Sequence, residues 1–238
     1  MQLEIRKIGK SKKYYLAHSF REGQKVKKMR RYLGTNLSEK QIGTLRKRAE
    51  EIIKKQIEQY QIIKNPLQFE LTEAQIKLIK DLENKIDPKL LHLSQTDWKK
   101  FTNLFTYNTN AIEGSQVRLN EVNKILHNEW PQDVSKQDIS ETYGVAEALQ
   151  YLKDTKEHIS LSLIKKLHGI VFKNSKSFTG KLRSKGIEVV IRDNLGNIIH
   201  IGAPSNRIKG LLEELINWYN KHKNKYTGLL LATVIHNQ

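Results

Sequence analysis

The sequence predicts a mainly α-helical protein with a small, basic β-sheet at its N-terminus. Residues 1–34 contain three short runs typical of strands, separated by two turn-like segments. From Ser38 onward the apolar residues recur with the period of a helix, behind a capping box that pairs Ser38 with Gln41. A second capping box pairs Thr72 with Gln75. These three observations together predict the fold class.

The individual elements follow in chain order. Strands are expected at 3–8, 14–20 and 25–33. Helices are expected from each capping box to the Asn-Pro pair at 65–66 and the Asp-Pro pair at 87–88, because proline does not continue a helix. Further helices are expected at about 94–110, 119–128, 136–153, 161–173, 205–219 and 227–238, with Ser205 as a cap. One hairpin interrupts them, with strands at 188–191 and 198–201.

The charge of the chain favours anionic partners. Lysine and arginine number 42 against 25 acidic residues, a net charge of +17, and residues 1–34 hold 11 basic and 2 acidic residues. Nucleic acid and acidic protein surfaces fit such an excess, although an unpartnered lysine-rich surface has the same composition. Tyr14, Tyr15 and Tyr32 lie among these charges. They would either stack on bases or form the core of the sheet, and the core interpretation is favoured.

Several classes of protein are excluded by what the sequence lacks. With no cysteine there are no disulfides, thiolate zinc sites or cysteine nucleophiles. The zinc-protease, P-loop, dinucleotide-binding and serine-hydrolase motifs are absent as well. No signal-peptide core is found, and the longest apolar run is too short to cross a bilayer. We therefore expect a cytoplasmic protein with no membrane partner.

One short segment carries a more specific pattern. Residues 109–114, Thr-Asn-Ala-Ile-Glu-Gly, place a threonine four residues before a glutamate that is followed by glycine. Taken alone, the segment is a helix end, with Gly114 as a left-handed cap and Glu113 in a solvated last turn. A carboxylate at the C-terminus of a helix opposes the helix dipole, which indicates a partner for Glu113.

In combination with other motifs, this segment resembles the Fic (Fido) family of AMP transferases. Residues 109–114 are similar to the family's inhibitory-helix motif. The other matching segments are Leu-Asn-Glu-Val at 119–122, the first core helix at 160–172, Phe-Thr-Gly-Lys-Leu-Arg at 178–183, the flap hairpin at 188–201, and the helix at 232–238. The resemblance covers about residues 90–238, and its strength lies in the order of the segments.

The resemblance implies a fold and a domain organisation. The expected fold is mainly α, with an incomplete Fido helical core and a β-hairpin flap behind the basic sheet. The expected segments are a sheet at 1–36, a helical linker at 37–90, and the N-terminal part of a Fido domain at 91–238. The family signature, His-Pro-Phe-x-(Asp/Glu)-Gly-Asn-Gly-Arg-x-x-Arg, is absent from these 238 residues. We therefore expect a chain truncated before its catalytic loop, with no catalytic residue and no metal ligand.

The resemblance also assigns roles to particular residues. Glu113 would pair with the second arginine of the signature and so compete with the γ-phosphate of ATP. Thr109 would orient Glu113 or cap the helix locally, with a plain helix residue as an equal alternative, and Gly114 would complete the inhibitory motif. In the flap, the residues expected to border the nucleotide and the target are Gly196, Asn197, Ile198 and Ile199. The exposed strand edge of the flap would receive a target segment through main-chain hydrogen bonds.

These expectations define a leading function and its alternatives. The chain is expected to be the regulatory and target-docking portion of an enzyme that transfers AMP from ATP to a protein hydroxyl, and to be inactive alone. ATP and Mg²⁺ are implied for the complete family member and are not held by this chain. The expected partners are a protein with a Ser, Thr or Tyr hydroxyl and a complementing C-terminal polypeptide. The alternatives are a nucleic-acid or protein-binding module that uses the basic sheet, and a gene fragment without function.

Overall fold

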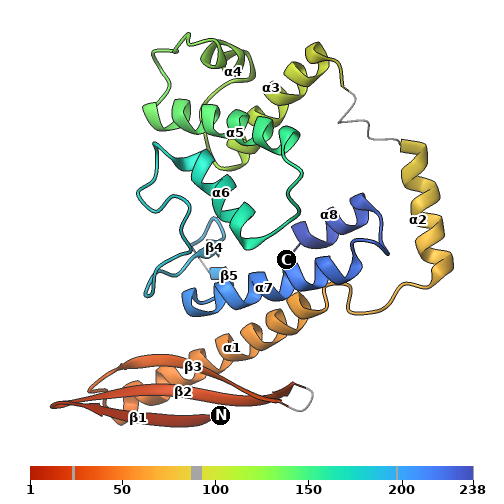
Figure 1. Cartoon of the computed structure of the whole chain (residues 1–238). Helices are drawn as coiled ribbons and strands as arrows, with labels where there is room; N and C mark the ends of the chain where they lie inside the picture. The colour runs from red at the N-terminus through yellow and green to blue at the C-terminus, as the bar shows by residue number, and fades with distance from the viewer. Residues whose placement is uncertain (23–24, 87–92, 197, 238) are drawn as a thin grey trace. The chain divides into compact units, whose positions relative to one another are not determined.

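The computed structural model describes residues 1–22, 25–86, 93–196 and 198–237, which form eight helices and five strands (Figure 1). These residues group into two compact units, Met1–Phe69 and Glu70–Asn237. The fold is mainly α, as predicted, with a small basic sheet at the N-terminus. The first unit contains both the sheet and the first helix, so this grouping differs from the segments proposed at 1–36, 37–90 and 91–238. Those boundaries stay a prediction.

Three antiparallel strands form the sheet of the first unit: β1 (Gln2–Ile8), β2 (Ser11–Glu22) and β3 (Lys25–Thr35), in the order β1-β2-β3. Gln2 at the start of β1 lies opposite Ala17 of β2. Strand β3 pairs with β2 beyond that point, where Ser19 lies opposite Lys28 and Arg21 lies opposite Val26. Past Ala17 the sheet therefore continues as a two-stranded ribbon of β2 and β3.

Helix α1 (Glu39–Lys64) packs on one face of this sheet, against β2 and β3 (Figure 1). Its predicted capping box is confirmed, since the backbone N–H of Gln41 donates to the Ser38 hydroxyl and the Ser38 N–H donates to the Gln41 side chain at 2.9 Å. Leu16 of β2 and Ile53 of α1 are fully buried between them. The ring of Tyr60 meets Phe20 edge-on at 6.0 Å.

The tyrosines of the sheet divide between the two predicted roles. Tyr14 is buried on the α1 side, so the core interpretation is confirmed for this residue. Tyr15 is half-buried, and Tyr32 is 51% exposed. The core interpretation is therefore wrong for Tyr32. Tyr32 lies directly opposite Tyr15, so the two residues share a face of the sheet. Because alternate residues of β2 face opposite sides, that face is the one opposite to Tyr14 and α1.

The second unit contains the other helices and the hairpin. Its elements are α2 (Glu73–Ile86), α3 (Gln95–Ile112), α4 (Leu119–Leu126), α5 (Lys136–Asp154), α6 (Leu161–Phe172), β4 (Val190–Arg192), β5 (Ile198–Ile201), α7 (Ser205–His222) and α8 (Gly228–His236). Helix α5 contacts α3, α4 and α6, and a chain of contacts continues from α6 to α7 and from α7 to α8. The helix positions agree with the sequence to within a few residues.

Helix α5 and helix α6 approach each other closely at a glycine. A Cβ atom placed on Gly144 of α5 would lie 2.2 Å from the carbonyl oxygen of Val171 on α6. No side chain fits in that space, so only glycine permits this helix–helix distance. The contact fixes α6, and α6 in turn carries the segment that leads to the hairpin.

The start of α7 differs from the sequence prediction. Ser205 is the first residue of the helix and not its cap, and Pro204 stands at the N-cap position. The backbone N–H of Arg207 donates to the Pro204 carbonyl at 2.8 Å. Proline has a fixed φ, −58° here, and it ends the extended segment one residue earlier than a serine cap requires.

Within the described residues, none of the helices is both long and apolar enough to cross a membrane.

Candidate functional site

The end of α3 carries the segment that the sequence analysis singled out. Glu113 is the C-cap residue, and Gly114 follows in the left-handed region at φ +88°. The N–H of Gly114 donates to the Ala111 carbonyl at 3.1 Å, and the N–H of Ser115 donates to the Asn110 carbonyl at 3.0 Å. This pair of hydrogen bonds is a Schellman motif, so the helix stops at a defined residue.

A buried polar contact anchors this helix end to α5. Asn110 is 6% exposed and donates from Nδ2 to the hydroxyl of Thr142 at 3.1 Å. Thr142 is fully buried and donates in turn to the carbonyl of Asp138 at 2.7 Å. Because buried polar groups are costly to leave unpaired, this chain of hydrogen bonds holds the last turn of α3 in place.

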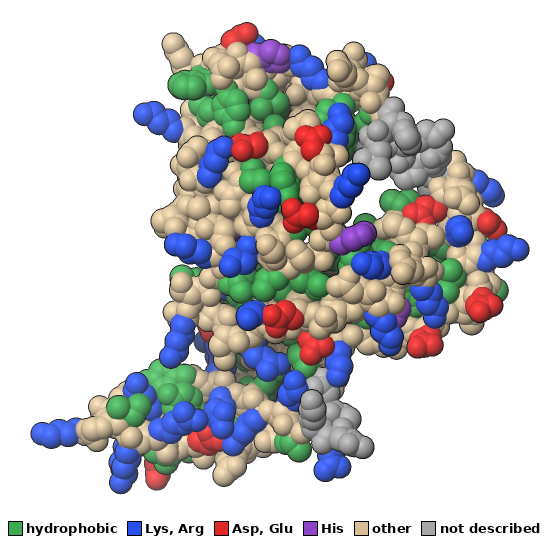
Figure 2. Space-filling view, in the orientation of Figure 1, with side chains coloured by type: hydrophobic (Ala, Val, Ile, Leu, Met, Phe, Trp, Pro, Cys, Tyr) green, Lys and Arg blue, Asp and Glu red, His purple; other side chains and the backbone are tan. Residues whose placement is uncertain are grey.

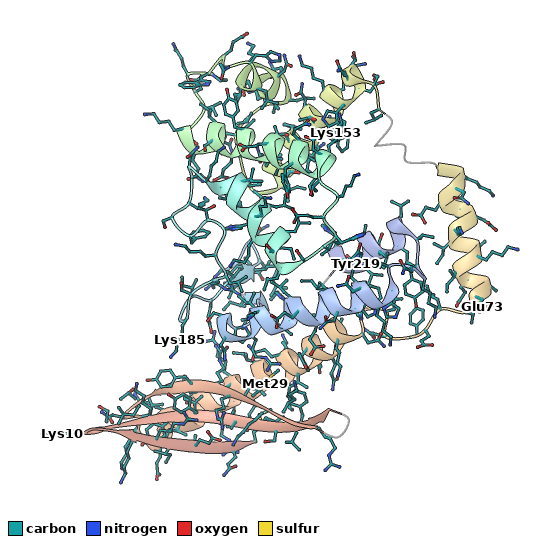
Figure 3. All side chains as sticks on the ribbon, in the orientation of Figure 1. Lys10, Met29, Glu73, Lys153, Lys185 and Tyr219 are labelled. Atoms are coloured by element: carbon teal, nitrogen blue, oxygen red, sulfur yellow. The ribbon has the colours of Figure 1, made fainter. Side chains whose placement is uncertain are left out.

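The other end of α3 is also attached to α5. The ammonium group of Lys153 lies over the ring of Trp98, 4.5 Å from its centroid (Figure 3). A cation over a tryptophan face is attracted to the ring. The two contacts, one near each end, fix the direction in which the helix presents its final residues.

Glu113 lies at the exposed surface of this helix end. Its side chain is exposed, and the preceding Ile112 is 84% exposed. Thr109, one turn earlier, is half-buried. Both Thr109 and Glu113 lie in the described part of the chain, and no hydrogen bond joins their side chains there. The predicted roles of Glu113, Thr109 and Gly114 in inhibition stay predictions.

Helix α4 and a small apolar cluster support the segment after Gly114. Val117, Val122 and Ile125 are buried together and pack against Tyr107 and Tyr143, among others. Glu121, in the Leu-Asn-Glu-Val segment, accepts a hydrogen bond from the backbone N–H of Arg118 at 2.7 Å and so closes the start of α4. The chain on both sides of Glu113 is therefore held by packing.

The approach to the hairpin is fixed to α6 by hydrogen bonds between side chains and the backbone. The N–H of Gly180 donates to Nδ1 of His168 at 2.8 Å, and the hydroxyl of Thr179 lies 3.1 Å from the carbonyl of Gly169. Gly180 has φ +65°, and a Cβ there would lie 3.3 Å from the Lys165 carbonyl oxygen. The left-handed backbone conformation thus favours glycine at this position, and a Cβ atom would also be in tight contact with the Lys165 carbonyl oxygen.

Arg183 ties the base of the hairpin to the segment that follows it. Its Nη2 donates to the carbonyl of Ala203 at 2.5 Å, across 20 residues of sequence. The N–H of Gly202 donates to the carbonyl of Val189 at 2.8 Å. These two bonds close the hairpin at its base, where Phe178-Thr-Gly-Lys-Leu-Arg183 and the residues after β5 meet.

The hairpin itself is a short two-stranded sheet. Val190 lies opposite Ile201 and Ile191 opposite His200, with a register irregularity before Arg192. In the turn, Gly196 has φ +81°, and its carbonyl accepts from Nη1 of Arg192 at 2.7 Å. The first strand begins two residues later than predicted. Asn197 lies outside the described residues.

Exposed aliphatic side chains surround this hairpin. Those more than half exposed are Ile187, Val189, Ile191, Leu195 and Ile199, with Leu195 at 86%. Ile198 is half-buried. A two-stranded sheet leaves the outer edge of each strand without a strand partner, and strand edges with exposed apolar side chains are suited to pairing with an extended peptide.

The described residues do not fit Mg²⁺. Among them there is no group of three or more histidine, aspartate and glutamate side chains placed to hold a metal ion. The residues that hold the nucleotide and the metal in the family signature have no counterpart in the sequence. The end of α3 supplies an exposed carboxylate, and the hairpin supplies strand edges with exposed aliphatic side chains.

Comparison with known proteins identifies the fold. No family model and no curated protein matches the sequence. Among solved structures, the chain is similar to a Fic domain containing signaling protein from Bacteroides thetaiotaomicron, with 22% identity, a TM-score of 0.54 and coverage of 68% of this chain. It is also similar to a Fic family protein from Desulfovibrio desulfuricans, with 17% identity, a TM-score of 0.52 and 71% coverage. The fold is thus that of Fic domain proteins, which confirms the resemblance seen in the sequence at the level of the fold. The chain spans 62% and 51% of these two proteins.

Three residues that position the site were missed by the sequence analysis: Asn110, His168 and Arg183. Asn110 and Arg183 lie inside motifs that had been noticed, but their partners are 32 and 20 residues away. His168 contacts Gly180 across 12 residues. For Asn110 and His168 the sequence signal is a polar residue within a helix that also carries apolar residues, and Arg183 lies in the segment between α6 and β4. Neither feature identifies a partner.

Proposed function

We propose that this chain supplies the regulatory and target-docking part of a Fic-type enzyme that transfers AMP from ATP to a protein hydroxyl. In this proposal Glu113 restrains transfer, and the hairpin β4–β5 receives the target. The catalytic loop with the family signature is supplied by residues outside these 238. ATP, Mg²⁺ and a target protein with a Ser, Thr or Tyr hydroxyl belong to the assembled enzyme.

The observation that carries the proposal is the exposed carboxylate of Glu113 on a helix end that is held by hydrogen bonds and packing. A Schellman motif, the Asn110–Thr142 contact and the apolar cluster around Val122 all hold the backbone near it. An exposed carboxylate on such a support is ready to accept a bidentate pair of hydrogen bonds from an arginine. An arginine held in this way is no longer available to a phosphate group.

The hairpin supports the second half of the proposal. Its closed base, formed by Arg183 with Ala203 and by Gly202 with Val189, holds the two strands at a fixed place. Its strand edges and exposed aliphatic side chains suit an extended target segment, which would bind through main-chain hydrogen bonds with little demand on its sequence. The hydroxyl to be modified would lie on that segment.

Incorporation of labelled AMP into protein tests the proposal. Residues 1–238 alone should transfer no AMP, because the family signature, which would supply the general base, the metal ligand and the phosphate-binding loop, is absent from their sequence. The chain is then extended by a segment that carries the family signature. Transfer by this extended chain should be weak, and Glu113→Gly should raise it about ten- to a hundredfold, since a hydrogen bond to a charged group contributes about 1.5–3 kcal/mol.

Glu129→Gly is the matched control, because Glu129 is an exposed glutamate in the loop after α4. This substitution should leave transfer unchanged. Equal transfer with and without Glu113→Gly would show that Glu113 is only a solvated helix-end residue. Transfer by residues 1–238 alone would show that the chemistry resides elsewhere than proposed.

A further inference from the structure

The sheet of the first unit has one face that α1 does not cover. Leu16 and Phe20 of β2 point toward α1, so the alternate residues Lys13, Tyr15 and Arg21 point away from it. Residues directly opposite one another share a face. The open face therefore consists of Gln2, Glu4, Arg6 and Ile8 of β1, Ser11, Lys13, Tyr15, Ala17, Ser19 and Arg21 of β2, and Val26, Lys28, Arg30 and Tyr32 of β3.

The open face is strongly basic. Five lysine and arginine side chains share it with one carboxylate, that of Glu4. Glu4 forms ion pairs with Lys28, with Arg30 at 2.9 Å and with Arg6 at 3.7 Å. Three cations therefore surround a single carboxylate. Lys13 and Arg21, near the two ends of β2, are not among its partners. Figure 2 shows lysine and arginine side chains gathered over the part of the molecule that contains the sheet.

Two tyrosines occupy the middle of this face and are engaged with their neighbours. The rings of Tyr15 and Tyr32 are tilted against each other at 5.3 Å, and the guanidinium of Arg6 lies 5.1 Å from the centroid of Tyr15. The hydroxyl of Tyr32 lies 2.5 Å from that of Thr35. Because Arg6 lies over the ring of Tyr15 and the two rings pack against each other, the faces of Tyr15 are less available for stacking on single-stranded bases.

The dimensions of the face fit a groove of duplex DNA. The outer strands of a three-stranded sheet lie about 10 Å apart, against a major groove about 12 Å wide that admits a two-stranded ribbon. Strand β2 has 12 residues, so it is about 40 Å long, close to one turn of DNA. Beyond Ala17 only β2 and β3 remain, and this narrower ribbon carries Arg21 and Lys28.

We propose that the open face of the sheet binds duplex DNA, with the β2–β3 ribbon in the major groove. Lys13, Arg21 and the cations around Glu4 would contact phosphates and base edges, as arginine and lysine do in other β-sheet readers of DNA. Lys10, at the tip of the β1–β2 turn, adds a further cation at the end of the face (Figure 3). Duplex RNA is a poorer fit, because its major groove is too narrow for side chains to read.

Fluorescence anisotropy with the full chain and a labelled mixed-sequence duplex of about 20 base pairs tests the proposal. Binding should be in the micromolar range at about 50 mM salt and should weaken steeply by about 200 mM, because each neutralised phosphate releases counterions. The double variant Lys13→Gln/Arg21→Gln should weaken binding on the order of tenfold and reduce the salt slope by about 2.

The matched control is Lys40→Gln/Lys47→Gln, which removes the same charge from exposed positions of α1. It should change binding less than about twofold if contact is confined to the open face. Circular dichroism on both double variants checks that the sheet is intact. Equal losses in the two variants would show diffuse attraction to a basic surface and would overturn the proposal.

Competition with other nucleic acids completes the test. Single-stranded DNA or duplex RNA that displaces the probe better than duplex DNA would overturn the groove-binding arrangement. Failure of every nucleic acid to bind at low salt would leave an acidic protein as the partner of the face and would also overturn it. The inference concerns Met1–Phe69 alone and does not rest on AMP transfer, so either can fail without the other.

Discussion

Glu4 is the residue whose ionisation bears most directly on the sheet. Hydrogen bonds from Lys28 and then Arg30 lower the pKa of its carboxyl to about 2, from an ordinary value of 4.5. A carboxyl with a lowered pKa in the folded state contributes stability above its unfolded pKa and loses it as pH falls through its folded pKa. The contribution of Glu4 is therefore complete above about pH 5 and disappears toward pH 2.

Glu4→Gln should lower the melting temperature at neutral pH, because it leaves Arg6, Lys28 and Arg30 close together without their carboxylate. The difference between wild type and variant should shrink to nothing near pH 2. Carbon-13 NMR of the Glu4 carboxyl measures its titration directly. A midpoint near 4.5 would contradict the ion-pair network.

Asn110 is the residue on which the end of α3 depends. Asn110→Ala removes the hydrogen bond to Thr142 and leaves part of a buried polar chain unpaired, at a cost of about 1–3 kcal/mol. Amide hydrogen exchange at Gly114 and Ser115 should then accelerate about tenfold or more, since 1.4 kcal/mol is a factor of ten. Asn220→Ala, on the exposed surface of α7, should leave these amides unchanged. Unchanged exchange in Asn110→Ala would show that the Schellman motif alone holds the helix end.

At the scale of elements, the contact between α5 and α6 can be tested directly by substitution of Gly144. Gly144→Ala would place a methyl group 2.2 Å from the Val171 carbonyl oxygen and force the two helices apart. Overpacking of this kind costs about 1–3 kcal/mol or more. Trp98, Trp130 and Trp218 all lie in this unit, so tryptophan fluorescence follows its unfolding.

Gly210→Ala provides the opposite expectation on α7. A Cβ at Gly210 would meet nothing within 4 Å, and alanine is favoured over glycine inside a helix by about 1 kcal/mol. Unfolding monitored by tryptophan fluorescence should therefore shift to lower denaturant for Gly144→Ala and to higher denaturant for Gly210→Ala. Equal shifts for the two variants would mean that the α5–α6 distance is larger than described.

The elements also show what can be predicted from sequence. The starts of α1 and α2 follow from the capping boxes at Ser38 and Thr72, because these signals involve residues only three apart. The Schellman end of α3 is equally local and was visible as Gly114. The burial of Asn110, the contact of His168 with Gly180 and the bond from Arg183 to Ala203 each join distant residues. They depend on how the helices pack, which the local pattern does not contain.

At the scale of the whole molecule, the chain combines a basic sheet unit with a unit of Fic-like fold. The two proposals place different activities on these units: duplex DNA binding on Met1–Phe69 and restraint of AMP transfer on Glu70–Asn237. No residue is shared between the two proposed surfaces. Substitutions in one unit are therefore expected to leave the activity of the other intact.

Separation of these two activities is the central claim, and one measurement tests it most directly. Labelled AMP incorporation is compared for the extended chain with Glu113→Gly and for the same chain that also carries Lys13→Gln/Arg21→Gln. The account predicts equal transfer by both, about ten- to a hundredfold above the extended chain with Glu113 in place. Loss of that gain on adding the sheet substitutions would contradict the account, because it would place the basic sheet in the AMP-transfer site or its target contact.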